Sequence, residues 1–205
     1  MKKTKILSRI EATKKTHELI EVHVKKQVDD FEVGFPIASD HRWLIIAAIN
    51  TEGQFDGFTL FALKRIKKIK VGTAYLAIVH HYIDFAKTHQ LYDPLKLADR
   101  QKQIKHWEKN LSRQLLILLA KKRAFVTIGG RFKIIPTGRI LAASTHGFTF
   151  QPFYEFNYTV ADPLTISLKD IAFIQFWDIY DDLYQYTAPK IAKKTFQIQS
   201  ETKTD

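Results

Sequence analysis

Two predicted strands and the polar turn between them occupy residues 31–50, FEVGFPIASDHRWLIIAAIN. Both ends of the stretch are rich in aromatic and β-branched residues, which favours strands, and Ser39-Asp40 supplies turn chemistry between them. Pro36 cannot donate a hydrogen bond to a neighbouring strand, so it marks a sheet edge or a bulge. The stretch therefore predicts a pair of short strands with an irregularity at Pro36.

Similar runs lie on both sides of this pair. Before it, helical spacing predicts a helix over 5–17, and alternation predicts a strand over 19–24. After it, we expect strands over 55–63 and 66–71 and a helix over 73–90. Asp93-Pro94 then resembles a helix N-cap followed by proline, and the spacing from Ile104 to Leu118 predicts one long helix that ends near Arg123. The order then starts again, with predicted strands over 124–128, 132–142, 148–154, 164–168 and 171–176.

This repetition keeps a nearly constant offset, as an internal duplication should. At an offset of 104, Leu7-Ser8-Arg9 falls on Leu111-Ser112-Arg113, and Gly34 falls on Gly138. One inserted residue in a loop then moves the offset to 105, where Leu63-Lys64 falls on Leu168-Lys169. The alternative is that any two segments made of a helix and strands can be slid into phase.

The duplication predicts an α+β fold of two tandem five-stranded antiparallel small barrels, each preceded by a helix and joined by a helical connector. The boundaries we expect are 1–84 for the first helix and barrel, 85–108 for the connector, 109–187 for the second helix and barrel, and 188–205 for a polar tail with a disordered end.

The composition narrows the class of protein. The chain has 205 residues, is 45% hydrophobic and contains no cysteine, which excludes fibrous, disordered and disulfide-scaffold proteins. Its longest apolar runs, Trp43 to Ile49 and Leu115 to Ala120, are far shorter than the roughly 20 residues that cross a bilayer. The basic start is followed by no apolar signal region, so we expect a cytoplasmic protein without a membrane span.

The net charge of +11 is unevenly distributed. Residues 85–123 hold ten Lys and Arg against three Asp and Glu, a local excess of +7, whereas the β-rich stretches are slightly acidic. An anionic partner should therefore meet the basic segments. The candidate nucleic-acid-binding residues are Lys64, Arg65, Lys67, Lys68, Lys102, Lys105, Lys109 and Arg113. A guarded edge strand and a solvated helix face are the alternative interpretations of these cations.

A helix followed by five short strands resembles the Sm-like fold of RNA-binding small barrels. Gly34 and Asp40 match the glycine and the acidic residue of that family's first motif, with Ile37 and Trp43 at its apolar positions. Two copies in one chain resemble bacterial tandem small-barrel proteins of unassigned function. The resemblance implies the fold, and it carries no RNA-binding residue across.

The departures from the motif explain why no RNA-binding residue carries over. Leu44 stands where the family has its base-contacting asparagine, and Ala62-Leu63 replaces its arginine-glycine pair. In the second copy, Ser144 replaces the acid and Phe148 occupies the asparagine position.

No catalytic constellation emerges from the sequence. There is no cysteine nucleophile, no Gly-x-Ser-x-Gly elbow and no glycine-rich phosphate loop. His80 and Asp84 have a spacing that can hold a metal, but no third ligand points to the same place, so a solvated helix face is the favoured interpretation. We expect no enzyme activity, no metal and no cofactor.

The sequence thus predicts a non-enzymatic binding protein, with RNA before DNA as its partner. The alternative is a protein-protein interaction module or regulatory adaptor, including self-association through the barrels. Burial of Leu44 and Phe148 would favour this alternative, because the base-contact positions of the resembling family would then belong to the core.

Overall fold

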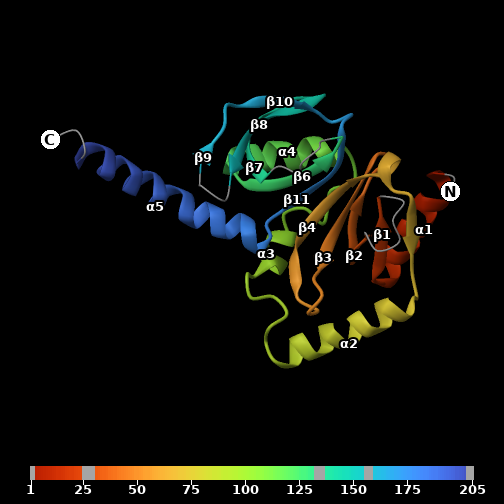
Figure 1. Cartoon of the computed structure of the whole chain (residues 1–205). Coiled ribbons are helices and arrows are strands. Elements are labelled where there is room, and N and C mark those ends of the chain that lie inside the picture. The colour runs from red at the N-terminus through yellow and green to blue at the C-terminus, as the bar shows by residue number, and fades with distance from the viewer. Residues whose placement is uncertain (1–2, 25–30, 132–136, 155–158, 202–205) are drawn as a thin grey trace.

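The computed structural model describes residues 3–24, 31–131, 137–154 and 159–201, and its elements are labelled in Figure 1. The first half of the chain holds α1 (Lys3–Thr16), β1 (Ile20–His23), β2 (Phe31–Ser39), β3 (Trp43–Ile49), β4 (Phe55–Ala62), the 3-10 turn η1 (Leu63–Arg65) and β5 (Lys68–Lys70). Two helices follow, α2 (Ala74–Thr88) and α3 (Leu97–Gln101). The second half holds α4 (Leu111–Lys122), β6 (Phe125–Gly130), β7 (Thr137–Ala143), β8 (Gly147–Tyr154), β9 (Thr159–Val160), β10 (Leu164–Ser167) and β11 (Ile171–Phe176), and the last helix is α5 (Ile179–Glu201).

The strands form one open antiparallel sheet, so the prediction of two closed barrels is wrong. The order along the sheet is β10-β8-β7-β6-β11-β4-β3-β2-β1-β5, with β9 pairing only β8. Closure would need each half to pair its last strand with its own fourth strand. Instead β11, the last strand of the second half, pairs with β4 of the first half, and β5 and β10 stay at the two ends.

Large apolar side chains explain why the two halves join at β4 and β11. Phe173 lies opposite Phe61 and Phe176 lies opposite Phe58, and the rings of Phe58 and Phe176 stack with centroids 5.5 Å apart. Phe58, Phe61 and Phe176 are buried, Phe173 is partly buried, and Trp177 packs edge-on against Phe58. Burying these rings between the halves removes more apolar surface from water than two separate small cores could. One core cluster consequently contains residues of both halves.

Within each half the strands follow the same order and register. Gly34 of β2 lies opposite Ala48 of β3, and Gly138 of β7 lies opposite Pro152 of β8. Each residue of the second pair is 104 positions after its counterpart in the first pair. The register shifts at Pro36/Ala38 in the first half and at Ile140/Ala142 in the second, again with the same offset. Of the two alternatives predicted at Pro36, a sheet edge or a bulge, the structure shows the bulge, and the equivalent point of the other half also has one.

The long helix predicted to follow Asp93-Pro94 and to end near Arg123 is interrupted. Helix α3 ends at Gln101 and α4 begins at Leu111, with turns between them in which Ile104 is nevertheless fully buried. The spacing of the apolar residues from Ile104 onward suits a helix, but Asn110 adopts a left-handed backbone conformation with φ of 55°. A chain reversal there starts α4 as a new helix, placed against β7.

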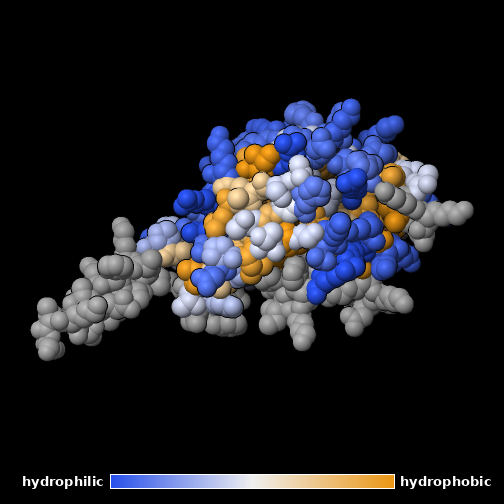
Figure 2. Space-filling model, turned by 90° about the horizontal axis from the view of Figure 1, so that it is seen from above, coloured by the Kyte–Doolittle hydropathy of each residue, from blue (hydrophilic) through white to orange (hydrophobic). Residues whose placement is uncertain are grey.

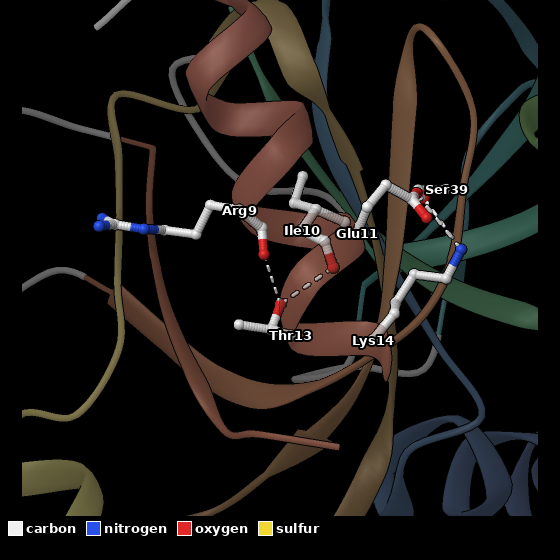
Figure 3. Close-up of polar contacts among 6 residues, drawn as sticks. All are labelled: Arg9, Ile10, Glu11, Thr13, Lys14 and Ser39. Atoms are coloured by element: carbon white, nitrogen blue, oxygen red, sulfur yellow. Dashed lines mark hydrogen bonds and ion pairs between the residues drawn. The ribbon is translucent and has the colours of Figure 1, made fainter. Parts of the chain in front are cut away.

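Helix α1 is tied to the end of β2 by a small polar network (Figure 3). Ser39 Oγ donates to Glu11 Oε1 at 2.6 Å, and Lys14 Nζ donates to both Glu11 and Ser39. The hydrogen bond from Ser39 and the charge of Lys14 lower the pKa of Glu11. On the same helix, the hydroxyl of Thr13 donates to the backbone carbonyls of Arg9 and Ile10. The network fixes the residue that directly precedes the turn at Asp40.

The remaining helices lie at the periphery. Helix α2 runs along one end of the first half, and α5 projects from the body of the molecule (Figure 1). Residues 188–201 of the expected polar tail belong to α5, and the last residues of the tail, 202–205, lie outside the described residues. The face in Figure 2 mixes hydrophilic residues with exposed hydrophobic ones. In the part of the chain that the structure describes, no helix combines the length and apolar character needed to cross a membrane.

Candidate functional site

A cleft of about 600 Å³ opens where turns from both halves meet at the start of α4. Positively charged side chains surround it, and apolar side chains form part of its wall. We call it the cationic cleft. Its lining residues are Asp40, His41, Arg42, Trp43, Ala62, Lys64, Asn110, Ser112, Arg113, Thr145, His146, Leu168 and Lys169.

Equivalent positions of the two halves face this cleft. The β2–β3 turn contributes His41 and Arg42, and the β7–β8 turn contributes Thr145 and His146, at the offset of 104. Lys64 after β4 and Lys169 after β10 stand at the offset of 105. The matched turns meet because β11 pairs with β4.

Asp40 connects the first half to α4. Its Oδ1 accepts the backbone N–H groups of Arg42 at 2.7 Å and Trp43 at 2.8 Å, which closes the turn. Its Oδ2 accepts the N–H of Leu111 at 3.0 Å, the first residue of α4. A carboxylate is favourable at a helix N-terminus, where backbone N–H groups have no partner within the helix. Asp40 is the only carboxylate among the lining residues, and all three of its hydrogen bonds are used structurally.

Positive charge is crowded on the opposite wall. Lys64 Nζ and Arg65 Nη2 both donate to the backbone carbonyl of Lys169, at 3.0 and 3.2 Å. Desolvation, together with the charges of Arg65 and Arg131, lowers the pKa of Lys64. Asp170 acts in the opposite direction but is shared with Arg131, 3.6 Å away. Cations held this close lower the free energy of any anion that enters.

The first four predicted binding residues, Lys64, Arg65, Lys67 and Lys68, do not lie together: two belong to η1 and two follow it. Lys64 lines the cationic cleft, and Arg65 lies directly beside it. Lys67 and Lys68 are exposed farther along, where Lys68 belongs to β5 at the open end of the sheet and pairs with His23 of β1. The interpretation as an edge-strand residue therefore fits Lys68, whereas Lys67 lies one residue before β5.

The second group is also divided. Arg113 lines the cationic cleft, whereas Lys102 is exposed and bonds Asp99 at 2.6 Å. Lys105 lines a separate cavity of about 430 Å³, together with Lys14, His17, Tyr92 and His106 among others. Lys109 is exposed one residue before Asn110. The structure brings Lys64 and Arg113 together and leaves the other members of the set outside the cleft.

Sequence reasoning missed Arg42 and Lys169, because it looked for runs of cations and these two stand in short turns. The offset that aligns Lys64 with Lys169 was the available signal. Such turns with a cation at the same position become neighbours here because the halves join edge to edge through β4 and β11. Ser112 was aligned with Ser8 but was given no role.

Leu44 and Phe148 are buried, with exposed fractions of 0% and 2%. They occupy the positions of the base-contacting asparagine in the resembling family. Both side chains belong to the core, so these two positions are not available to a base.

A group of carboxyl side chains lies apart from the cleft. Glu32 of β2 accepts a hydrogen bond from Thr59 of β4, and burial raises the pKa of Glu32 to about 7, with further contributions from the charges of Asp56 and Asp178. Burial also raises the pKa of Asp56 to about 6, with the charge of Asp178 adding to it. These groups can hold protons near neutral pH, and none of them lines the cationic cleft.

The histidines of α2 are exposed on the helix surface, as is Asp84. His89 Nδ1 lies 2.9 Å from the carbonyl oxygen of Phe85, and the two rings stack. Among the residues that the structure describes, no group of three His, Asp or Glu side chains has the arrangement of a metal site.

Comparison of the chain with protein-family models, with curated proteins and with solved structures found no match in any of the three.

Proposed function

We propose that this protein is a non-enzymatic binding protein that holds single-stranded nucleic acid, RNA before DNA, in the cationic cleft. The observation that carries the proposal is the convergence of Arg42, Lys64, Arg113 and Lys169 from both halves on one cleft. Neutralising phosphates with Lys and Arg releases counterions, which drives sequence-independent binding. RNA comes first because of the motif resemblance at Gly34 and Asp40.

The shape of the cleft supports a single strand. Its wall includes Trp43, Ala62 and Leu168 between the cations, so an unpaired base has apolar surface beside it while its phosphate meets positive charge. A volume of about 600 Å³ is within the range of pockets that enclose small organic molecules. A duplex would present only its backbone to such an opening.

The test is a fluorescence anisotropy titration of labelled single-stranded RNA of about ten nucleotides, with single-stranded DNA and double-stranded RNA of the same length as comparisons. We expect the double variant Arg42→Gln/Arg113→Gln to bind the single-stranded RNA at least about tenfold more weakly, because two phosphate contacts are lost.

The matched control is Lys68→Gln/Lys102→Gln, which removes the same charge from exposed positions outside the cleft. Its affinity should stay within about twofold of the wild-type value, because only the general attraction is reduced. Equal losses in the two double variants would overturn the cleft as the binding site, and absence of binding by the wild-type protein would overturn the function.

A second candidate function, protein-protein contact, is favoured by a stripe of exposed apolar side chains on α2. The helix buries one face against the sheet and leaves the stripe in solvent. The stripe consists of Tyr75, Ile78, Tyr82 and Phe85. Burial of Leu44 and Phe148 also favours this candidate, as set out for the sequence.

A second copy of the chain is the partner that can be tested directly. If α2 mediates self-association, light scattering should show a mass that rises with concentration and returns to the monomer value in Ile78→Glu. A monomer at every concentration would exclude self-association through α2.

A further inference from the structure

Ser112 is a nearly buried polar residue that has no partner. It is the second residue of α4, its exposed fraction is 8%, and its hydroxyl makes no hydrogen bond within the described residues. It lines the cationic cleft. The described side-chain atoms that are enclosed without a partner belong to Arg65, Arg139 and Asp181, so the oxygen of Ser112 is not enclosed and keeps contact with the solvent of the cleft. The hydroxyl is therefore available to a ligand in the cleft.

The backbone beside Ser112 offers further donors. Helix α4 has no side-chain cap from Asn110, and its own hydrogen bonds begin with the N–H of Gln114 to the carbonyl of Asn110. The N–H of Leu111 is taken by Asp40. The N–H groups of Ser112 and Arg113 come too early in the helix to have an acceptor within it, and they carry the positive end of the helix dipole.

Three exposed cations line the same cleft as Ser112. They are Arg42, Arg113 and Lys169, and none of them forms an ion pair with a carboxylate in the described part of the chain. Asp40 is the single opposing charge, and its oxygens already accept three backbone N–H groups. The local balance is positive, with a hydroxyl and two N–H groups ready to donate.

We propose that this corner of the cleft, formed by Ser112, Arg113 and Arg42, is a phosphoryl-binding subsite. Tetrahedral phosphoryl oxygens would accept from the Ser112 hydroxyl and from the first-turn N–H groups of α4, while the guanidinium groups neutralise their charge. The inference rests on the proposed function by naming the part of the ligand that the cleft holds. A nucleic-acid backbone and a free nucleotide share this chemistry.

The first half of the chain provides no equivalent subsite. Ser8 and Arg9 of α1 are the counterparts of Ser112 and Arg113 at the offset of 104. Ser8 is exposed and donates to the carbonyl of Lys5, and Arg9 donates to the carbonyl of Ile69 at 3.0 Å. Both counterparts are thus occupied by the protein itself. The structure assigns one phosphoryl subsite to each chain, and Ser8 serves as its internal control.

The test compares Ser112→Ala, Ser112→Thr and Ser8→Ala with the wild-type chain. The probes are inorganic phosphate, a nucleoside monophosphate and the single-stranded RNA, with binding followed by anisotropy for the RNA and by amide NMR shifts for the small anions. We expect Ser112→Ala to weaken all three ligands by about tenfold, the effect of losing a hydrogen bond to a charged group. Ser112→Thr keeps a hydroxyl and should restore most of the affinity, and Ser8→Ala should change nothing.

The outcomes separate the two proposals. RNA binding that is unchanged in Ser112→Ala, with a native circular dichroism spectrum, overturns the subsite and leaves the proposed function standing. Phosphate and nucleotide binding that depends on Ser112, without RNA binding, supports the subsite and overturns the nucleic-acid function. Failure of all three probes to bind the wild-type chain overturns both.

Discussion

Gly34 and Gly138 occupy the same structural position in the two halves of the sheet. A Cβ at Gly34 would lie 2.3 Å from the carbonyl oxygen of Ala47, and a Cβ at Gly138 would lie 2.2 Å from that of Gln151. Each glycine also sits two residues before the register shift of its strand pair. The close approach of two backbones, and not backbone freedom, explains the glycine at both points.

Gly34→Ala and Gly138→Ala should therefore each lower the free energy of unfolding by at least about 2 kcal/mol, because a backbone carbonyl cannot move aside as a flexible side chain can. Urea denaturation measures the loss. Gly72→Ala is the control: nothing lies within 4 Å of its Cβ position, and only its φ of 60° opposes alanine. A loss of about 1 kcal/mol is expected there. Equal losses at all three glycines would contradict the packing explanation.

Asp40 and Ser144 stand at equivalent positions of the two halves but bond to different parts of the chain. Ser144 closes its own turn through hydrogen bonds with Gly147, whereas Asp40 closes its turn and also caps α4 across the two halves. Asp40→Ala should lower the free energy of unfolding by about 1 to 2 kcal/mol, the usual effect of losing a helix cap. Ser144→Ala should have a smaller effect in the same thermal or urea denaturation. A larger loss in Ser144→Ala would show that the contact with Leu111 adds no stability.

The raised pKa of Glu32 predicts that stability falls as the pH rises. The folded chain holds the proton up to a pKa of about 7, against an ordinary value of 4.5, so the contribution is complete below about pH 4.5 and is lost as the pH rises through 7. The shift corresponds to a loss on the order of 3 kcal/mol. Asp56, with a pKa of about 6, acts in the same direction.

Glu32→Gln should flatten much of this pH dependence, and the exposed Glu108→Gln should leave it intact. The measurement is urea denaturation at about pH 5, 6, 7 and 8 for the three chains. A slope unaffected by Glu32→Gln would contradict the raised pKa of Glu32 as the source of the pH dependence.

The sequence predicted most of the strands but neither the break between α3 and α4 nor the pairing of the two halves. Alternation over 31–50 and the bulge at Pro36 follow from side-chain size and from the missing N–H of proline, both of which are local properties. Closure of each half into a barrel depends on which edge strands pair with each other. This pairing is made by backbone hydrogen bonds, which no side-chain pattern predicts. Phe58 and Phe61 are apolar residues of a predicted strand, but their spacing does not say that the rings opposite them come from residues 173–176 of the other half.

The site was predicted in part for the same reason. Lys64 and Arg113 were found because they belong to basic segments, and both line the cleft. Arg42 and Lys169 lie in turns of low charge density, where only the meeting of the two halves makes them neighbours. The interrupted helix had a similar origin, since the spacing of Ile104 and Leu111 suits a continuous helix and Asp40, from another part of the chain, caps the new one.

The most direct test of the cleft is the salt dependence of RNA binding in the wild-type chain and in Arg42→Gln/Lys169→Gln. Each phosphate neutralised on a single strand contributes about −0.7 to the slope of log affinity against log salt. We predict that the double variant has a slope smaller in magnitude by about 1.4, while Lys68→Gln/Lys102→Gln keeps the wild-type slope. A slope unchanged by loss of Arg42 and Lys169 would contradict the claim that the cationic cleft holds the nucleic-acid backbone.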